Sequence, residues 1–154
     1  MNAIQFIQQH GVEKAREVVE GAPEWASEYC TDCNDYVNYD DACNDGFSDC
    51  ESCVSVNNIK RLVESVDIIN KFDSVQEAKD AISNAPHGAT DYRKLSCTIR
   101  YIKQSERFFE YWDGYIWCRP TVPFTDETHI LRFKELSTLE QAIADYESIG
   151  GEHV

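Results

Sequence analysis

The sequence predicts an α+β fold made of two pseudo-repeated helix–β–helix units, and internal similarity is the first reason. Residues 12–29 align with residues 75–92 at an offset of 63 without a gap, and six of the eighteen positions are identical. A weaker match aligns residues 56–66 with residues 136–146 at an offset of 80. Repeated segments in one chain indicate a duplicated structural unit. Chance similarity between amphipathic helices is the alternative.

The two matches divide the chain into unit one, residues 1–66, and unit two, residues 67–154. A chain of 154 residues is long enough for one domain or for two small ones. We therefore expect either two lobes or a single merged domain. The apolar content of 42 % is ordinary and sufficient for a hydrophobic core.

Unit one is expected to begin and end with helices. Apolar residues recur at helical spacing over residues 4–20, with a break or bend near Gly11. Pro23 ends this run, because proline cannot continue a helix. A further helix is expected to begin at Asn57 or Asn58, since asparagine is a favoured N-cap residue.

Unit two is also expected to carry a helix at each end. Ser74 and Glu77 form a capping-box pattern at the start of its first helix, and Pro86 ends that helix. Ser137 begins the last helix in the same way, and the glycine pair at residues 150–151 ends it.

The β section of unit two follows from its alternation of apolar and polar residues. Residues 97–103 alternate in this way, as a strand does when one face is buried. Residues 108–112 and 115–119 flank Asp113-Gly114, and such a dipeptide between aromatic runs is a strong hairpin signal. A further strand is expected over residues 130–133.

The middle of unit one is short and polar, so it can bury little apolar surface by itself. It carries two Cys-x-x-Cys pairs separated by sixteen residues, Cys30 with Cys33 and Cys50 with Cys53. This spacing is typical of a closed, tetrahedral zinc site with four thiolate ligands, which is structural rather than catalytic. We expect Zn²⁺ to stabilise this loop, because metal binding free energy becomes folding free energy in such modules.

Other interpretations of this cysteine-rich segment are weaker. The cysteines could pair as disulfides or stay reduced, and the odd total of seven argues against a pure disulfide framework. Cys43 lies between the two pairs as a spare ligand or a bystander. A calcium EF-hand beginning at Asp41 is excluded, because Cys43 and Ser52 occupy two of the ligand positions.

Charge is extreme and uneven along the chain. The formal net charge is −14, and residues 17–59 hold eleven acids without one Lys or Arg. Such a surface repels nucleic acid and anionic membranes, so it favours a basic protein surface as partner. The plainer alternative is that the charge only aids solubility. The candidate partner-binding residues are the acids around and between the cysteine pairs, namely Glu28, Asp32, Asp35, Asp40, Asp41, Asp45, Asp49 and Glu51.

No catalytic or targeting motif is present in the sequence. None of the four histidines lies in a metalloprotease, kinase or hydrolase motif, and no glycine-rich phosphate loop occurs. We therefore expect no enzymatic activity. The chain shows neither a secretory signal nor an apolar run of membrane-spanning length, which favours the cytoplasm.

A nucleic-acid-binding role for unit two is the alternative function. Residues 93–134 carry 8 basic and 5 acidic residues, and Trp112 and Trp117 lie among cations such as Arg107 and Arg119. Aromatic side chains with interleaved cations can stack the bases of single strands. A small regulatory protein could use this sheet in that way. Its excess of three positive charges is small beside the acids that flank it, so we rank this function second.

A family resemblance narrows the setting. The opening pattern Phe6-x3-His10-Gly11-x3-Ala15-x6-Ala22-Pro23, with the later segment IKRLVES at residues 59–65, resembles small acidic accessory proteins of lambdoid phages and prophages. The resemblance covers mainly residues 1–70 and transfers no catalytic residue. It implies a protein of the bacterial cytoplasm that acts on a host factor. Together with the acidic charge, it favours an anti-restriction or anti-CRISPR inhibitor that mimics the charge of DNA.

Overall fold

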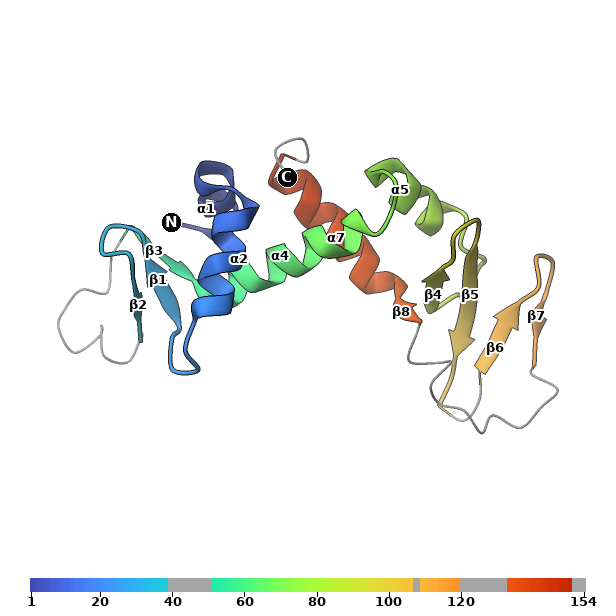
Figure 1. The fold of residues 1–154 in the computed structure, drawn as a ribbon. Helices are drawn as coiled ribbons and strands as arrows, with labels where there is room; N and C mark the ends of the chain where they lie inside the picture. The colour runs from blue at the N-terminus through green and yellow to red at the C-terminus, as the bar shows by residue number, and fades with distance from the viewer. Residues whose placement is uncertain (39–50, 107–108, 120–132, 151–154) are drawn as a thin grey trace.

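The computed structural model describes the chain except for residues 39–50, 107–108, 120–132 and 151–154. The described residues form helices and two antiparallel sheets, so the predicted α+β class is confirmed. Figure 1 shows a small sheet at one end of an elongated molecule, a larger sheet at the other end, and helices between them. No helix within the described ranges is long and apolar enough to cross a membrane.

Two helices, α1 (Ala3–His10) and α2 (Val12–Gly21), open the chain. Asn2 caps α1, because its side-chain oxygen accepts a hydrogen bond from the Gln5 backbone N–H at 2.8 Å. Gly11 separates the two helices with a φ of 86°, a conformation that glycine adopts without steric cost. The predicted break near Gly11 is therefore confirmed.

The β section of unit one is a three-stranded antiparallel sheet in the order β2-β1-β3. Its strands are β1 (Glu28–Cys30), β2 (Asp35–Val37) and β3 (Cys53–Ser55). Strand β3 leads directly into α4 (Val56–Asn70), so the helix begins earlier than the sequence pattern predicted. Its N-cap is Ser55 and not Asn57 or Asn58, and the Ser55 hydroxyl accepts from the Asn58 N–H at 3.3 Å.

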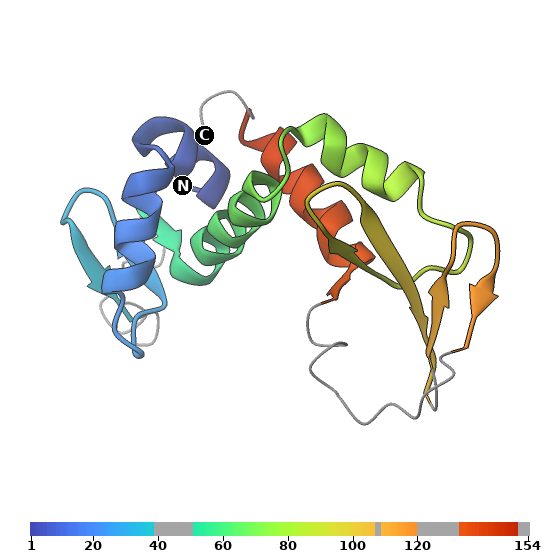
Figure 2. The same cartoon turned by 45° about the vertical axis from the view of Figure 1, so that its right-hand side comes forward.

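Unit two begins with α5 (Val75–Ser83), and the predicted cap is confirmed because the Ser74 hydroxyl accepts from the Glu77 N–H at 3.1 Å. The unit ends with α7 (Leu136–Ser148), whose N-cap is Glu135 rather than the predicted Ser137. A strand runs directly into this helix, so the chain turns two residues before the serine. Figure 2 shows α5 and α7 next to the larger sheet.

The larger sheet is antiparallel, in the order β7-β6-β5-β4-β8. Its strands are β4 (Asp91–Lys94), β5 (Ile99–Gln104), β6 (Phe109–Trp112), β7 (Trp117–Cys118) and β8 (Lys134–Glu135). Pairing of β6 with β7 confirms the predicted hairpin. Strand β4 was missed because three of its four residues are charged. The strand expected at residues 130–133 falls almost entirely outside the described residues, and β8 begins just after it.

The two units arrange their strands in the same order. Strand β1 pairs with β2 and β3 in unit one, and β4 pairs with β5 and β8 in unit two. Tyr29 lies opposite Val54 in the small sheet, and Tyr92 lies opposite Lys134 in the larger one. These partners are separated by the same offsets of 63 and 80 residues that align the sequence segments.

Contacts that connect strands and helices also have counterparts in the two units. In each unit a tyrosine hydroxyl donates to a helix carbonyl, and ion pairs join α2 to α4 and α5 to α7. These contacts are Tyr36 with Val18 and Tyr101 with Ala81 for the tyrosines, and Arg16 with Asp67 and Lys79 with Glu147 for the ion pairs. The corresponding helices are therefore fastened in similar ways.

Two clusters of buried apolar side chains make up the core. One gathers α1, α2, β1, β3 and α4, with Phe6, Ile59 and Val66 at its centre, and the other gathers α5, β4, β5 and α7. Helix α4 contributes to both clusters, and Tyr146 of α7 contacts both. The boundary expected after residue 66 lies within α4, and the division into two domains stays a prediction.

Candidate metal site and acidic surface

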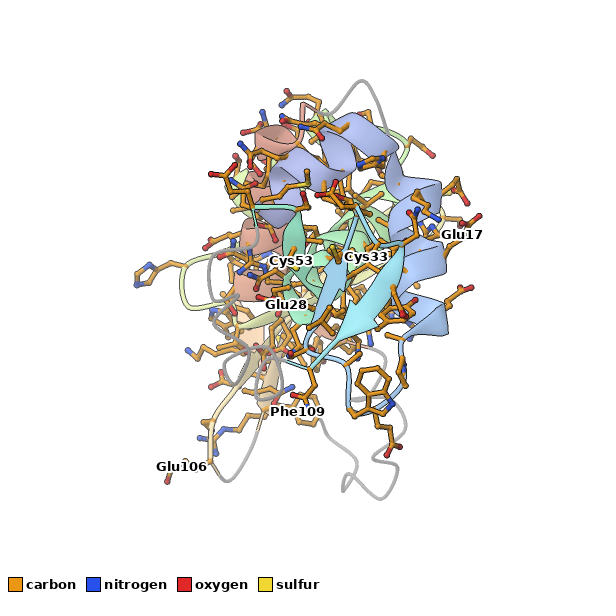
Figure 3. All side chains as sticks on the ribbon, turned by 90° about the vertical axis from the view of Figure 1, so that its left-hand side faces the viewer. Glu17, Glu28, Cys33, Cys53, Glu106 and Phe109 are labelled. Carbon is orange, nitrogen blue, oxygen red and sulfur yellow. The ribbon has the colours of Figure 1, made fainter. Side chains whose placement is uncertain are left out.

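Strand pairing brings two of the predicted zinc ligands to the same end of the small sheet. Cys30 is the last residue of β1 and lies directly opposite Cys53, the first residue of β3. Opposed residues in antiparallel strands have Cα atoms about 4.5–5.5 Å apart. Cys33 lies in the turn that leads from β1 to β2, and Figure 3 labels Cys33 and Cys53 on this sheet. Asn34 has a φ of 51°, a left-handed conformation that asparagine tolerates, so the chain reverses immediately after Cys33.

Hydrogen bonds connect the segments between the paired cysteines. The Thr31 N–H donates to the Ser52 carbonyl at 3.0 Å, and the Ser52 hydroxyl donates to the Asp32 carboxylate at 2.5 Å. The Met1 nitrogen donates to the Glu51 carbonyl at 2.7 Å, so the beginning of α1 is attached at the same place. These hydrogen bonds hold the segment of residues 31–32 next to the segment of residues 51–52.

The described cysteines differ in their exposure. Cys33 is exposed, Cys53 is intermediate and Cys30 is buried. Within the described part of the chain, no group of three or more His, Cys, Asp or Glu side chains is arranged to hold a metal ion. Cys50 and Cys43 lie outside the described residues. The zinc site stays a prediction, supported by the donor chemistry, because thiolates are ligands that zinc favours.

The small sheet is packed onto a hydrophobic core. Tyr29 and Val54, opposed in β1 and β3, are 5 % and 1 % exposed. The Tyr29 ring meets the rings of Phe6 and Tyr36 edge to face, with centroids 6.2 Å and 5.2 Å away. Helices α1 and α4 thus supply apolar surface that the polar middle of unit one lacks, and the sequence pattern did not reveal this contact.

The candidate partner-binding acids lie in the turns and strand ends of this sheet. Asp32, Asp35 and Glu51 are exposed, whereas Glu28 is half-buried. Asp32 accepts from Ser52, and Asp35 accepts from the following backbone N–H at 2.8 Å, so both carboxylates have fixed positions. The remaining four acids lie outside the described residues, namely Asp40, Asp41, Asp45 and Asp49.

Helix α2 adds a row of acids that the sequence analysis did not single out. Glu13, Glu17 and Glu20 are exposed and recur at intervals of four and three residues, so they share one helix face. Figure 3 labels Glu17 on the outer side of α2. Lys14 lies 3.5 Å from Glu17 and Arg16 lies 3.8 Å from Glu13, so cations partly offset this row. The helical spacing of the acids was the signal that could have found them.

An ion pair between α2 and α4 lowers the pKa of its carboxylate. Arg16 of α2 donates to both carboxylate oxygens of Asp67 on α4, one of them at 3.0 Å. This hydrogen bonding, together with the positive charge, holds the pKa of Asp67 below its ordinary value. The pair fastens the acidic helix to the central helix and so fixes the position of the glutamate row.

The aromatic hairpin of unit two exposes its tip. Tyr115 is 87 % exposed and Ile116 is 62 % exposed. The Asp113 carboxylate accepts from the N–H groups of Ile116 and Tyr115, both at 2.8 Å, and these bonds lower the pKa of Asp113. Trp117 is held differently, because its indole N–H donates to the His87 carbonyl at 3.1 Å. The tip therefore offers apolar surface on a turn in which Asp113 accepts two backbone hydrogen bonds.

Comparisons with protein-family models, with curated proteins and with solved structures find no match to this chain. The resemblance to phage accessory proteins thus stays a prediction. A function has to be argued from the residues and the geometry of this chain.

Proposed function

We propose that this chain is a non-enzymatic binding protein whose acidic unit-one surface docks on a basic surface of another protein. The observation that carries the proposal is the segment of residues 17–59, which holds eleven acids and no Lys or Arg. Most of its described acids are exposed, in the turns of the small sheet and on α2. Complementary charge speeds association and disfavours like-charged competitors.

We further propose that the partner is a host protein that this docking inhibits. A protein surface that binds DNA or RNA presents Lys and Arg side chains to the phosphates. A surface of closely spaced carboxylates can occupy such a site by mimicking the charge of the nucleic acid. The phage resemblance supports a setting in the bacterial cytoplasm and a partner among restriction, CRISPR or nuclease systems.

A structural Zn²⁺ bound by Cys30, Cys33, Cys50 and Cys53 completes the proposal. The metal would join the two strand ends and hold the acids between them in place. We also propose that the two units arose by duplication, which the equal offsets of their strand partners support. The zinc-bound loop would then stabilise unit one, as the additional strands stabilise unit two.

Affinity capture from a bacterial host lysate, followed by mass spectrometry, tests the partner class. The expected result is a specific basic protein that binds at low salt and is released as ionic strength rises, because salt screens exposed charges. Measured binding of that protein to its nucleic acid should fall when this chain is added. Capture that does not depend on salt, or an unchanged affinity of the partner for nucleic acid, would contradict charge mimicry.

A pair of triple variants tests the location of the surface. Neutralising three acids near the small sheet should slow association with the captured partner by on the order of tenfold. Neutralising three exposed acids elsewhere should have a much smaller effect. The two variants are Glu28→Gln, Asp35→Asn, Glu51→Gln and, as the control, Glu64→Gln, Glu106→Gln, Glu140→Gln. Equal losses in both would show that net charge alone acts.

The exposed hairpin tip favours the second candidate function, a regulatory nucleic-acid binder. Tyr115 is the most exposed large hydrophobic side chain of the described residues, and Lys103 of the same sheet lies over the Trp117 ring at 5.4 Å. A fluorescence titration with single-stranded DNA and RNA tests this function directly. Charge mimicry predicts no binding. Robust binding that is lost in Trp112→Leu or Arg107→Gln would replace our first proposal with this one.

A further inference from the structure

Unit two contains a cavity whose walls are basic, although the whole chain is strongly acidic. Its volume is about 620 Å³, within the size range of small-molecule sites. Four cationic side chains and two aromatic ones form much of its lining, namely Lys71, Arg93, Lys94, Lys134, Phe72 and Tyr92. The cations come from the end of α4, from β4 and from β8, and so only the folded chain brings them together.

The cavity lies beside one end of strand β4. Strand β8 pairs only with Asp91 and Tyr92 of β4. Arg93 and Lys94 continue β4 beyond that point, where no described strand lies along this edge. The end of β4 thus brings two cations to the wall of the cavity.

The charge of the cavity is only partly balanced by the protein. Lys94 forms an ion pair with Glu77 at 3.0 Å and lies over the Phe72 ring at 5.5 Å. Among the described residues, no salt bridge joins a carboxylate to Lys71, Arg93 or Lys134. Cations that share a cavity repel one another, and a bound anion would remove that repulsion.

Tyr92 adds a neutral donor to the wall of the cavity. The side chain is 6 % exposed, and no hydrogen bond joins its hydroxyl to another described residue. In unit one the hydroxyl of the corresponding Tyr29 lies 3.5 Å from the Asn34 side-chain oxygen. Among the described residues the Tyr92 hydroxyl thus has no hydrogen-bond partner, and it can donate to a ligand or to water.

We propose that this cavity binds a small organic phosphate, a phosphate monoester with its dianionic group among Lys71, Arg93, Lys94 and Lys134. Four cations with a single salt bridge among the described residues favour a ligand with more than one negative charge, and a phosphate monoester supplies about −1.5 to −2 at pH 7. The guanidinium of Arg93 can hold two phosphate oxygens at once. The remaining volume leaves room for the organic part beside Phe72 and Tyr92.

This site is independent of the proposed acidic docking surface, and it occupies a position that the two units use differently. Cys30 follows Tyr29 at the end of β1, and Arg93 and Lys94 follow the corresponding Tyr92 at the end of β4. One end of the same small framework thus carries thiols in unit one and cations in unit two. The side chains at this strand end therefore differ in chemistry between the two units, although the pairing of the strands is the same.

Titration of the full chain with adenosine monophosphate, followed by amide chemical shifts and by calorimetry, tests the proposal. Binding is expected to perturb the amides of Arg93, Lys94 and Lys134, with inorganic phosphate weaker and adenosine inactive. Arg93→Gln and Lys134→Gln should each weaken binding by about tenfold, the usual effect of losing a hydrogen bond to a charged group. Thermal melts verify that each variant folds.

Lys60→Gln is the matched control, because it removes one exposed positive charge from α4 at a distance from the cavity. It should leave the affinity unchanged. An equal loss in Lys60→Gln and Arg93→Gln would show that net charge alone attracts phosphate and would overturn the site. The absence of saturable binding by adenosine monophosphate, or equal binding of succinate, would overturn the preference for a phosphate monoester.

Discussion

Unit one and unit two share a strand order but differ in what their sheets carry. The small sheet carries cysteines and acids in its turns, whereas the larger sheet carries an aromatic hairpin and a basic cavity. The contacts common to both units lie between strands and helices, as with the hydroxyls of Tyr36 and Tyr101. The difference teaches that the helices and inner strands are the framework, while strand ends and turns are where function is expected.

The net charge also differs between the two parts of the chain. Residues 1–92 have a net charge of −12 and residues 93–134 have a net charge of +3. Opposite surface charges within one small chain allow an acidic surface to meet a basic protein while a separate cavity attracts an anion. Four predictions test how far the common framework extends, beginning with the largest expected effect.

Loss of the proposed zinc should have the largest effect, and only in unit one. Structural zinc contributes on the order of 10 kcal/mol of binding free energy in small modules. Cys30→Ser is expected to abolish zinc binding and unfold the small sheet, while the tryptophan signals of Trp112 and Trp117 persist. Zinc content by mass spectrometry and near-UV circular dichroism measure the two results.

Cys97→Ser is the control for that experiment, because Cys97 is an exposed cysteine of unit two. It should keep close to one equivalent of zinc per chain. Less than about half an equivalent in the gently purified parent protein would contradict the four-thiolate site.

Truncating a buried leucine in either core should lower the free energy of unfolding less than loss of the zinc does. Leu62 and Leu139 are 1 % and 0 % exposed, one in each cluster. Leu62→Ala and Leu139→Ala should each lower the free energy of unfolding by about 2–5 kcal/mol. Because α4 contributes to both clusters, we expect one unfolding transition in each variant by calorimetry. Two separate transitions would show that the units unfold as independent domains.

The paired tyrosine bonds should have a smaller and nearly equal effect in the two units. Tyr36→Phe and Tyr101→Phe each leave a helix carbonyl without its donor, at an expected cost of about 1–3 kcal/mol. Tyr115→Phe removes a hydroxyl that is almost fully exposed and should change stability very little. Urea denaturation of the three variants measures these values, and a cost confined to one unit would break the comparison.

The interhelical ion pair should have the smallest effect, and it depends on pH. The folded-state pKa of Asp67 is lowered, so the pair stabilises the fold above the ordinary carboxyl pKa and loses this contribution as pH falls through the folded-state pKa. The Arg16 and Asp67 side chains are 29 % and 46 % exposed, so the contribution is below about 1 kcal/mol. Asp67→Asn should therefore be destabilising at pH 7, and the loss should shrink as pH falls through the folded-state pKa in urea denaturation. Glu147→Gln should cause a similarly small loss at pH 7 in unit two, and a much larger loss in either variant would contradict a surface pair.

Local signals in the sequence predicted the helices and the aromatic hairpin. Ser74 caps a helix and Gly11 breaks one, because caps and glycine conformation depend on neighbouring residues. Strand β4 was missed, since Asp91, Arg93 and Lys94 conceal its alternation. Its strand character comes from neighbours on both sides, β5 and β8, which only the folded sheet supplies.

One candidate site could be recognised from the sequence, and the other could be recognised only from the folded structure. The cysteine spacing and the absence of Lys and Arg from residues 17–59 are properties of the sequence alone. The basic cavity was invisible there, because more than sixty residues separate Lys71 from Lys134 and no local spacing connects them. Its chemistry arises from strand pairing and helix packing.

By itself, the sequence determined the charge of this protein, which follows from its composition. It also determined the break at Gly11, the cap at Ser74 and the aromatic hairpin, because these depend on sterics and hydrogen bonds within a few residues. Only the tertiary structure decided that Cys30 lies opposite Cys53 and that four cations line one hollow. The physical reason is that strands pair where apolar side chains distant in sequence are buried together. This packing also determines where the polar side chains on those strands lie.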